Sequence, residues 1–169
     1  VTLALAQGVN CLALTDGDAC GTCRSCDRIT RDMHVDVITL EPDDSGAIKI
    51  DPVREVLSRT GFRPFEGQRR VVAIRDADAL NEGAQNALLK SLEEPPPATM
   101  FVLTSAAPDA LPRTVRSRTM RLAFGWLIRG EQYHLIFRKS GVADQGIGDG
   151  FGVVRRSAAH RGGAGFPRR

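Results

Sequence analysis

The sequence contains no hydrophobic run long enough to cross a bilayer. Its opening residues, VTLALAQGVNCLAL, also lack the basic start and the small-residue cleavage site of a secretory signal. What is present is typical of one globular domain: 169 residues, of which 42% are hydrophobic and 25% are charged. We therefore expect a cytoplasmic protein with no membrane partner.

Also missing is the phosphate-binding loop GxxxxGK[ST] of P-loop nucleotide hydrolases. Asp76 follows an apolar run, where such enzymes carry a magnesium-binding acid, but a cap of the following turn explains it equally well. No Ser, His and Asp arrangement indicates nucleophilic catalysis, and His34 and His134 fit solvated or packed side chains. We expect the chain itself neither to bind nor to hydrolyse ATP.

Aromatic residues are scarce, at 5%, and basic residues gather near the end of the chain. Residues 125–169 are basic and rich in glycine, with no sustained periodicity beyond a possible short strand at residues 133–137. A nucleic-acid-binding tail is not favoured, because regular aromatic interleaving is absent. We expect residues 1–124 to form the folded domain and residues 125–169 to be a divergent, disordered or non-native tail.

Cysteine is absent outside one short stretch, CLALTDGDACGTCRSC. The spacing Cys-x8-Cys-x2-Cys-x2-Cys brings four soft thiolates, Cys11, Cys20, Cys23 and Cys26, within reach of one tetrahedral ion, and glycines allow the tight turns between them. This pattern favours zinc over a disulfide pair or four unrelated buried cysteines. Because four protein ligands leave no open coordination position, the predicted zinc is structural.

Strand and helix patterns alternate between the cysteines and the tail. Short apolar runs, mostly β-branched, indicate strands at residues 35–40, 71–74, 99–104 and 119–122. Helices are indicated at residues 51–62, with Asp51 as N-cap and Pro52 at the first helical position, and at residues 82–93. Repeated βα units predict an α/β fold with a mostly parallel sheet covered by helices.

The run NALLKSLEEPPP, residues 86–97, ends a helix in an unusual way. Pro95 keeps Glu94 out of the helical region, and two glutamates stand near the negative end of the helix dipole, where acids are unfavourable. Local helix stability therefore does not explain this ending.

Five motifs occur in order: CGTCRSC, HVDVITLEP, IKIDPVREV, VVAIRDADALNEGAQNALLKSLEEPPPAT and LPRTVRSR. Together they resemble the delta-prime family of bacterial DNA polymerase III clamp-loader subunits, which belong to the AAA+ class. The resemblance runs from the first residue to about Phe124. Gamma and tau ATPase subunits share the zinc knuckle and NALLKxLEEPP and remain an alternative, although they typically carry Asp-Glu where this sequence has Arg75 and Asp76.

The resemblance implies a parallel-sheet, P-loop NTPase-like AAA+ module with a zinc-knuckle insertion at residues 11–28, lacking the first strand and the phosphate loop. That first strand is central in the AAA+ sheet. Residues 99–104 would then have an unpaired inner edge, and residues 119–122 would lack a partner unless the two closed over the gap. We expect the isolated chain to be marginally stable. A fragment, a frameshift or a mispredicted gene would account for the missing start of the module and for the divergent sequence after about Phe124.

The resemblance also implies site residues. RSR, residues 116–118, resembles the family's Ser-Arg-Cys motif with Thr119 in place of the cysteine. Arg118 is thus the candidate arginine finger, which reaches the ATP site of a neighbouring subunit. The LEEPP turn would lie near the face where subunits meet, and a rigid connector is the alternative reading of that turn.

The implied role is in DNA replication, within a DNA-directed DNA polymerase holoenzyme, a nucleotidyltransferase. Its implied partners are the gamma/tau and delta subunits and, through the complex, the sliding clamp and primed DNA. A free-standing zinc module that binds nucleic acid is a further alternative. It would need a basic or aromatic face, whereas the knuckle holds only Arg24 and Arg28 beside Asp16, Asp18 and Asp27.

Overall fold

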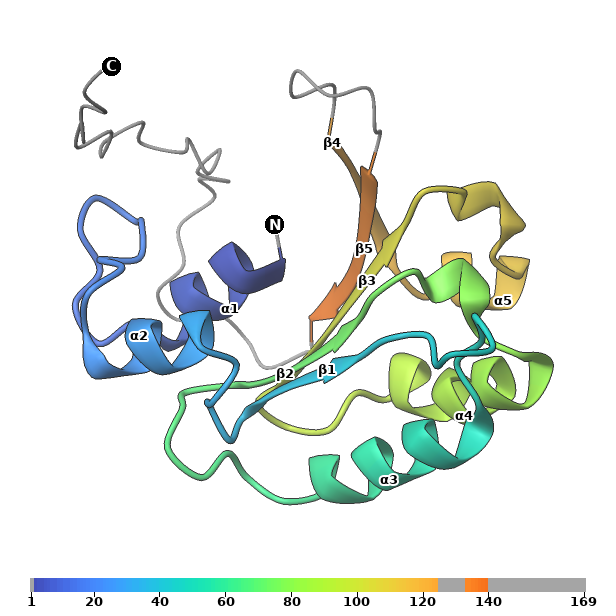
Figure 1. Ribbon diagram of the computed structural model, residues 1–169, viewed down its shortest axis with the longest axis horizontal. Coiled ribbons are helices and arrows are strands. Elements are labelled where there is room, and N and C mark those ends of the chain that lie inside the picture. Colours follow the sequence, from blue (N-terminus) through green and yellow to red (C-terminus); the bar gives the residue numbers. More distant parts are fainter. Residues whose placement is uncertain (1, 125–132, 140–169) are drawn as a thin grey trace, which may run out of the picture.

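A five-stranded sheet separates two layers of helices (Figure 1). The computed structural model describes residues 2–124 and 133–139. The strands are β1 (Val37–Leu40), β2 (Arg70–Ile74), β3 (Thr99–Ser105), β4 (Met120–Phe124) and β5 (Tyr133–Lys139). The helices are α1 (Thr2–Asn10), α2 (Arg24–Thr30), α3 (Ile50–Thr60), α4 (Glu82–Glu93) and α5 (Arg113–Arg116), with short 3-10 turns η1 (Ala77–Ala79) and η2 (Pro108–Ala110).

Strands β1, β2 and β3 are parallel, with β2 in the middle. Val37 lies opposite Val71, and Val71 lies opposite Met100. The α/β class, the parallel pairing and the strands expected near residues 35–40, 71–74 and 99–104 are therefore confirmed. Every residue of β2 is buried, as expected for a strand covered on both faces. In the described part of the chain, no helix combines the length and apolarity needed to span a membrane.

Alternate side chains of the strands enter two separate cores, as the period of two in a strand requires. One face packs against α3 and α4 through Val53, Val56, Val72, Ile74, Leu88, Leu92, Phe101 and Leu103. The other face packs against α1 and α2 through Ala6, Ile29, Val71, Met100 and Val102. The smaller core fastens the two helices that carry the cysteines to the sheet.

The inner edge of β3 is paired, so the expected open edge at residues 99–104 is wrong. Strand β5 runs antiparallel between β3 and β4, giving the sheet order β1-β2-β3-β5-β4. The possible strand at residues 133–137 thus exists and extends to Lys139, and the strand expected near residues 119–122 is β4. The marginal stability predicted from an open edge no longer follows. The expected disorder of residues 125–132 and 140–169 lies outside the described residues.

Helix α3 begins earlier than predicted. Its first residue is Ile50, and Lys49 rather than Asp51 occupies the N-cap position. Pro52 is therefore the third helical residue and not the first. A proline is tolerated there because the first four N–H groups of a helix have no partner within the helix.

Helix α4 covers the predicted residues 82–93. It begins after Asn81, whose side chain accepts a hydrogen bond from the N–H of Ala84 at 2.8 Å. Glu94 then leaves the helical region, with φ −124° and ψ 76°, because the following proline excludes the helical conformation. The helix therefore ends at Glu93, as expected from the sequence.

A buried ion pair holds the loop between α3 and β2. Asp36 is fully buried, and its Oδ1 lies 3.1 Å from Nη2 of Arg70. The Asp36 carboxylate also accepts the backbone N–H groups of Phe65, Glu66 and Gly67. Arg70 in turn donates to the carbonyl oxygens of Arg59, Phe62 and Arg63. The two charges together fix the path of the loop over residues 59–67.

The protonation of Asp36 follows from these contacts. Burial alone raises the pKa of this carboxyl, but the three backbone N–H donors and Arg70 outweigh burial and lower the pKa below its ordinary value. Asp36 is therefore charged at neutral pH, and the loop depends on that charge.

Candidate metal centre and arginine surface

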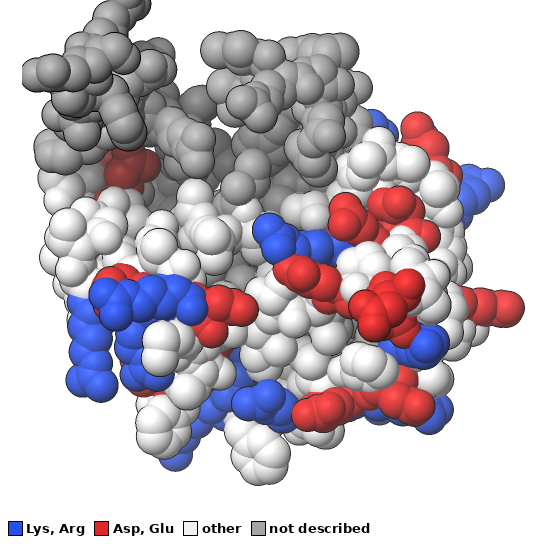
Figure 2. All heavy atoms as spheres, in the orientation of Figure 1, with Lys and Arg blue, Asp and Glu red and all other residues white. Residues whose placement is uncertain are grey.

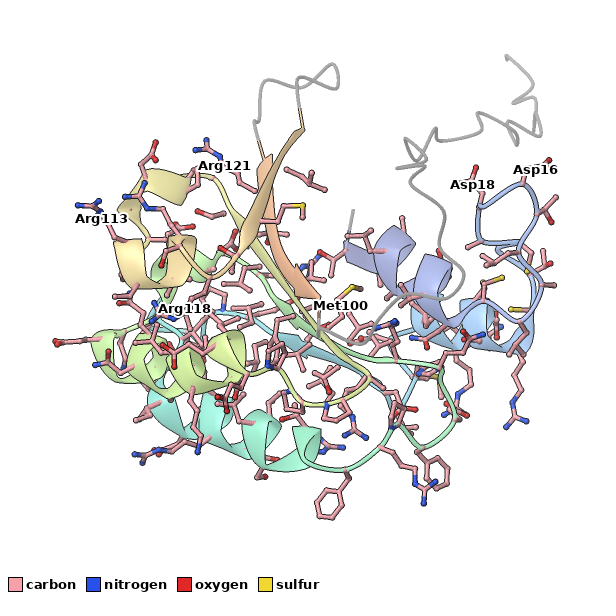
Figure 3. The ribbon with its side chains drawn as sticks, turned by 180° about the vertical axis from the view of Figure 1, so that it is seen from behind. Asp16, Asp18, Met100, Arg113, Arg118 and Arg121 are labelled. Carbon is pink, nitrogen blue, oxygen red and sulfur yellow. The ribbon has the colours of Figure 1, made fainter. Side chains whose placement is uncertain are left out.

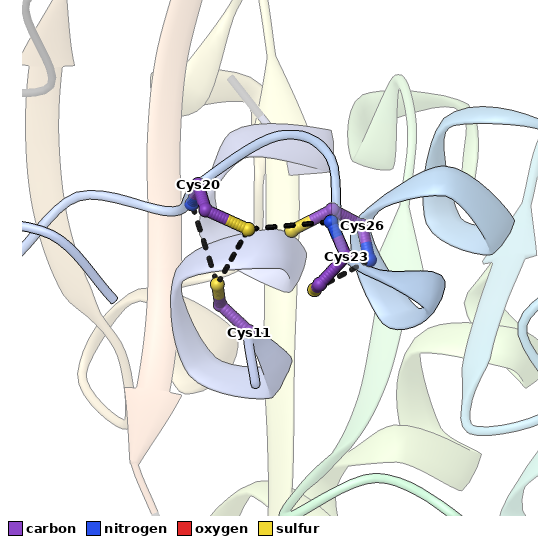
Figure 4. A group of neighbouring side chains, drawn as sticks. All are labelled: Cys11, Cys20, Cys23 and Cys26. Atoms are coloured by element: carbon purple, nitrogen blue, oxygen red, sulfur yellow. Dashed lines mark hydrogen bonds between the residues drawn. The ribbon is translucent and has the colours of Figure 1, made fainter. Parts of the chain in front are cut away.

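The four cysteine side chains converge beside α1 and α2 (Figure 4). Cys11 directly follows α1, Cys20 follows an exposed loop, and Cys23 and Cys26 lie at the start of α2. Their sulfur atoms all lie within 4.8 Å of one another, and the Sγ atoms of Cys11 and Cys20 are 3.6 Å apart. All four are free thiols, so the disulfide alternative is not adopted.

Backbone N–H groups point at these sulfur atoms. Cys20 N–H donates to Cys11 Sγ at 3.3 Å, Cys23 N–H donates to Cys20 Sγ at 3.3 Å, and Cys26 N–H donates to Cys23 Sγ at 3.5 Å. Such donors stabilise a thiolate, which is the form that binds metal. The chain therefore prepares the cluster to carry negative charge.

The thiols differ in acidity. Hydrogen bonds from the backbone of Thr22 and Cys23 lower the pKa of Cys20 to about 6, and a backbone hydrogen bond from Cys26 lowers the pKa of Cys23. Burial dominates at Cys26 and raises its pKa to about 12. A bound cation would offset this burial, because metal coordination deprotonates a thiol.

The loop before Cys20 has little packing of its own. Residues 12–18 are all exposed, including Leu12 and Leu14 at 66% and 54%. At its tip, Asp16 and Gly17 both have positive φ, in a two-residue turn that pairs Thr15 with Asp18. Such an exposed loop gains no stability from an apolar core, so the cysteine cluster is what fixes its conformation.

The cluster fits a tetrahedral metal ion. A zinc–sulfur bond of about 2.3 Å places the sulfurs of a regular tetrahedron about 3.8 Å apart. The sulfurs of Cys11 and Cys20 are 3.6 Å apart, close to this value, and all four sulfurs lie within 4.8 Å of one another. The four cysteines predicted from spacing are thus brought together and could hold one metal ion.

Charges near the cysteines are mixed. Arg28 pairs with Glu66 at 2.7 Å, and Arg31 pairs with Asp27 at 3.0 Å. On the face seen in Figure 2, basic and acidic side chains occur together, and acids gather on the side where α4 and α5 lie in Figure 1. This pairing does not favour a free-standing zinc module that binds nucleic acid, which needs an uncompensated basic face.

Arg118 lies at the other side of the molecule from the cysteine loop, between α5 and α4 (Figure 3). Its Nη1 donates to the carbonyl oxygen of Thr114 at 2.8 Å. Its Nε donates to Oε1 of Glu93 at 2.8 Å, and Nη2 donates to the same oxygen. The predicted finger is therefore a surface side chain, 31% exposed, held against the end of α4.

A hollow of about 360 Å³ lies on the opposite side of α5. Its lining consists of Pro108, Arg113, Arg116, Ser117, Thr119 and Arg121. Asp109 lies 2.9 Å from Arg116 and 3.8 Å from Arg121. Three arginines therefore line this hollow, and two of them pair with Asp109.

The remaining polar candidates lie apart from both sites. Asp76 follows β2 in a left-handed conformation before η1, and its side chain makes no capping hydrogen bond. His34 is a packed side chain, 4% exposed, whose Nδ1 accepts the N–H of Asp36 at 3.2 Å. His134 lies in β5, outside the described side chains.

Comparison with known proteins gives the family. Residues 1–127 match the family model described as DNA polymerase III, delta subunit, and the chain belongs to this family. It is 38% identical over 116 residues to DNA polymerase III subunit delta' of Escherichia coli, an alignment that covers 68% of this chain and 35% of that protein. DNA polymerase III subunit tau of Escherichia coli is 35% identical over 117 residues, covering 69% of this chain and 18% of that protein.

A solved structure agrees with this family. The crystal structure of a DNA polymerase III, gamma subunit-related protein from Thermotoga maritima matches with a TM-score of 0.52 and 26% identity, over 60% of this chain and 36% of that chain. The chain thus spans between 18% and 36% of the length of these three proteins. The resemblance to clamp-loader subunits seen in the motifs is confirmed at the level of the family.

Sequence reasoning singled out the cysteines and Arg118 as candidates but missed the groups around Arg118. The partner of Arg118, Glu93, left a signal in the sequence, since an acid at the end of α4 opposes the helix dipole. The hollow beside α5 was missed although its arginines, Arg113, Arg116 and Arg121, lie close together in the sequence, because the run does not show which face of the fold they share.

Proposed function

We propose that this chain acts as a delta-prime-type subunit of the bacterial DNA polymerase III clamp loader, an AAA+ module working in the cytoplasm. The observation that carries the proposal is the match of residues 1–127 to the DNA polymerase III delta subunit family. In this role the chain assembles with gamma/tau and delta subunits, whose ATP-driven cycle loads the sliding clamp on primed DNA. The assembly serves a DNA-directed DNA polymerase holoenzyme.

Arg118 is the group that acts on a neighbour's ATP in this proposal. Its side chain is 31% exposed at the surface, and a planar fork of N–H donors suits the charge that builds up on a transferring phosphoryl group.

The chain is not itself an ATPase in this proposal. Its 169 residues contain no GxxxxGK[ST] motif, and Arg75, in the place where the gamma and tau subunits typically carry an acid, is paired with Glu41. A gamma or tau ATPase subunit is the second candidate, because the identity to tau, at 35%, is close to the identity to delta'. Nucleotide binding separates the two candidates.

The metal at the cysteine cluster is proposed to be zinc with a structural role. The support is a set of four cysteine sulfurs at tetrahedral spacing around an exposed loop. With four thiolate ligands the ion has no open position for a substrate.

Assembly and ATP hydrolysis test the proposal together. The chain is expected to co-elute with the gamma/tau and delta subunits of its source organism and to raise their ATP hydrolysis. Arg118→Ala should still co-elute, yet hydrolysis should stay at the rate measured without the chain, because the finger is missing. Arg54→Ala, which alters an exposed arginine of α3, is the matched control and should behave like the wild type.

Two results would contradict the proposal. Equal hydrolysis with wild-type chain and Arg118→Ala would remove the finger role. Saturable micromolar ATP binding by the isolated chain would favour the gamma or tau alternative.

A further inference from the structure

The end of α4 carries acids where the helix dipole opposes them. Glu93 is the last residue of the helix, and Glu94 follows as its C-cap. Carbonyl groups at a helix C-terminus carry partial negative charge, so a carboxylate there is disfavoured. A contact outside the helix can offset this cost.

Glu93 has such a contact and Glu94 does not, within the part of the chain that the structure describes. Oε1 of Glu93 accepts Nε of Arg118 at 2.8 Å and also accepts Nη2. Among the described residues, Glu94 makes its hydrogen bond through its backbone N–H, which donates to Lys90 O at 2.9 Å. Glu93 and Glu94 therefore carry the same charge at adjacent positions, but only the Glu93 side chain contacts Arg118.

The contacts orient the Arg118 guanidinium. Glu93 occupies its Nε–Nη2 edge, and the carbonyl oxygen of Thr114 takes a hydrogen bond from Nη1 at 2.8 Å. Nη2 keeps one N–H, and the other contact of Nη1, with Ser117 Oγ, is long at 3.4 Å. One N–H of Nη2 and the weakly engaged N–H of Nη1 can therefore donate to an external anion while Glu93 holds the Nε–Nη2 edge.

We propose that Glu93 is a positioning residue for Arg118: it holds the guanidinium so that its free end faces the phosphate of a neighbouring subunit. This inference rests on the proposed finger role. An unheld arginine side chain samples many rotamers, and ordering it in advance lowers the entropic cost of reaching the transition state. Of the two acids in the LEEPP turn, Glu93 thereby has a function.

The test compares matched charge removals in the assembled complex. Glu93→Gln is expected to lower kcat for ATP hydrolysis roughly tenfold, with KM within about twofold, because positioning acts on the transition state. Glu94→Gln removes the same charge one residue away and is expected to leave both parameters unchanged. Glu93→Asp, which keeps the charge on a shorter side chain, should recover part of kcat. Thermal unfolding of each chain checks that the folds are equally stable.

The outcomes separate this inference from the proposed function. If Arg118→Ala abolishes the stimulation but Glu93→Gln does not lower kcat, the finger stands and the positioning role is wrong. Faster hydrolysis with Glu93→Gln would also overturn it, since Glu93 would then restrain the finger. If Arg118→Ala itself has no effect, the finger role fails and this inference fails with it. A fall in kcat that Glu94→Gln reproduces would mean a general charge effect, which likewise overturns the positioning role.

Discussion

Stripping the metal from the cysteine cluster is expected to unfold the segment from Cys11 to Cys26 while the sheet stays folded. The chain purified under reducing conditions should hold about one zinc per molecule. Zinc–thiolate sites in small domains contribute about 10–16 kcal/mol of apparent binding free energy, and that energy is also folding energy. Because residues 12–18 are exposed and gain little from packing, we expect the proposed metal to carry the stability of this segment.

Hydrogen exchange and metal analysis measure this effect. After chelation, amides of residues 11–26 should lose protection, whereas those of β2 and β3, which are buried in both cores, should keep it. Cys23→Ser with Cys26→Ser should reproduce the loss, because a serine hydroxyl is not a thiolate ligand. Asp18→Asn changes the same loop without touching a sulfur and should retain the metal.

Re-adding zinc provides the control. Protection should return in the stripped wild-type chain and not in the double variant. Reduced, folded protein that contains no metal, or that keeps its protection after chelation, would show that hydrogen bonds among the cysteines suffice to hold the loop.

Replacing Asp36 by asparagine is expected to lower the free energy of unfolding by about 3–5 kcal/mol. The substitution keeps the shape of the side chain but leaves Arg70, 7% exposed, as a buried cation without its partner. It also weakens the acceptor for the N–H groups of Phe65, Glu66 and Gly67. Urea unfolding followed by circular dichroism measures the change.

The matched control is Asp44→Asn, an exposed aspartate that should change stability by less than about 0.5 kcal/mol. An Asp36→Asn chain as stable as the wild type would show that the loop does not depend on the carboxylate charge. Arg70→Met offers a second view, since removal of the cation should also destabilise the chain by leaving Asp36 buried and unpaired.

The contribution of Asp36 to the free energy of unfolding depends on pH with a definite sign. The folded pKa of Asp36 lies below its ordinary value, so its stabilising contribution is present above the unfolded pKa and is lost as the pH falls through the folded pKa. Acid should therefore destabilise the wild type more steeply than Asp36→Asn below about pH 4. Equal acid sensitivity in the two chains would contradict this assignment.

The parallel part of the fold could be predicted because its signals are local. Runs such as VVAI in β2 are apolar enough to indicate burial on both faces, and proline after Glu94 fixes the end of α4. The cysteine cluster was found for the same reason, since three of its four members lie within seven residues.

The features that the sequence did not predict depend on distant parts of the chain. A short strand was indicated where β5 lies, but its antiparallel place between β3 and β4 was not, because its partners come from other parts of the chain. Glu93 and Arg118 are 25 residues apart, and Asp36 and Arg70 are 34 apart. No local pattern specifies such a pair, although an acid at an unfavourable helix end is a signal that could have pointed to one.

The insertion of β5 also sets an order on assembly during synthesis. Strands β1, β2 and β3 can join one after another as they are made, because each new strand pairs with the one before it. Strand β4 has to wait, since its partner in the described sheet is β5, which is translated later. Until β5 emerges from the ribosome, the growing chain presents the bare flank of β3, so this interval is when a nascent chain most needs protection from pairing with another strand.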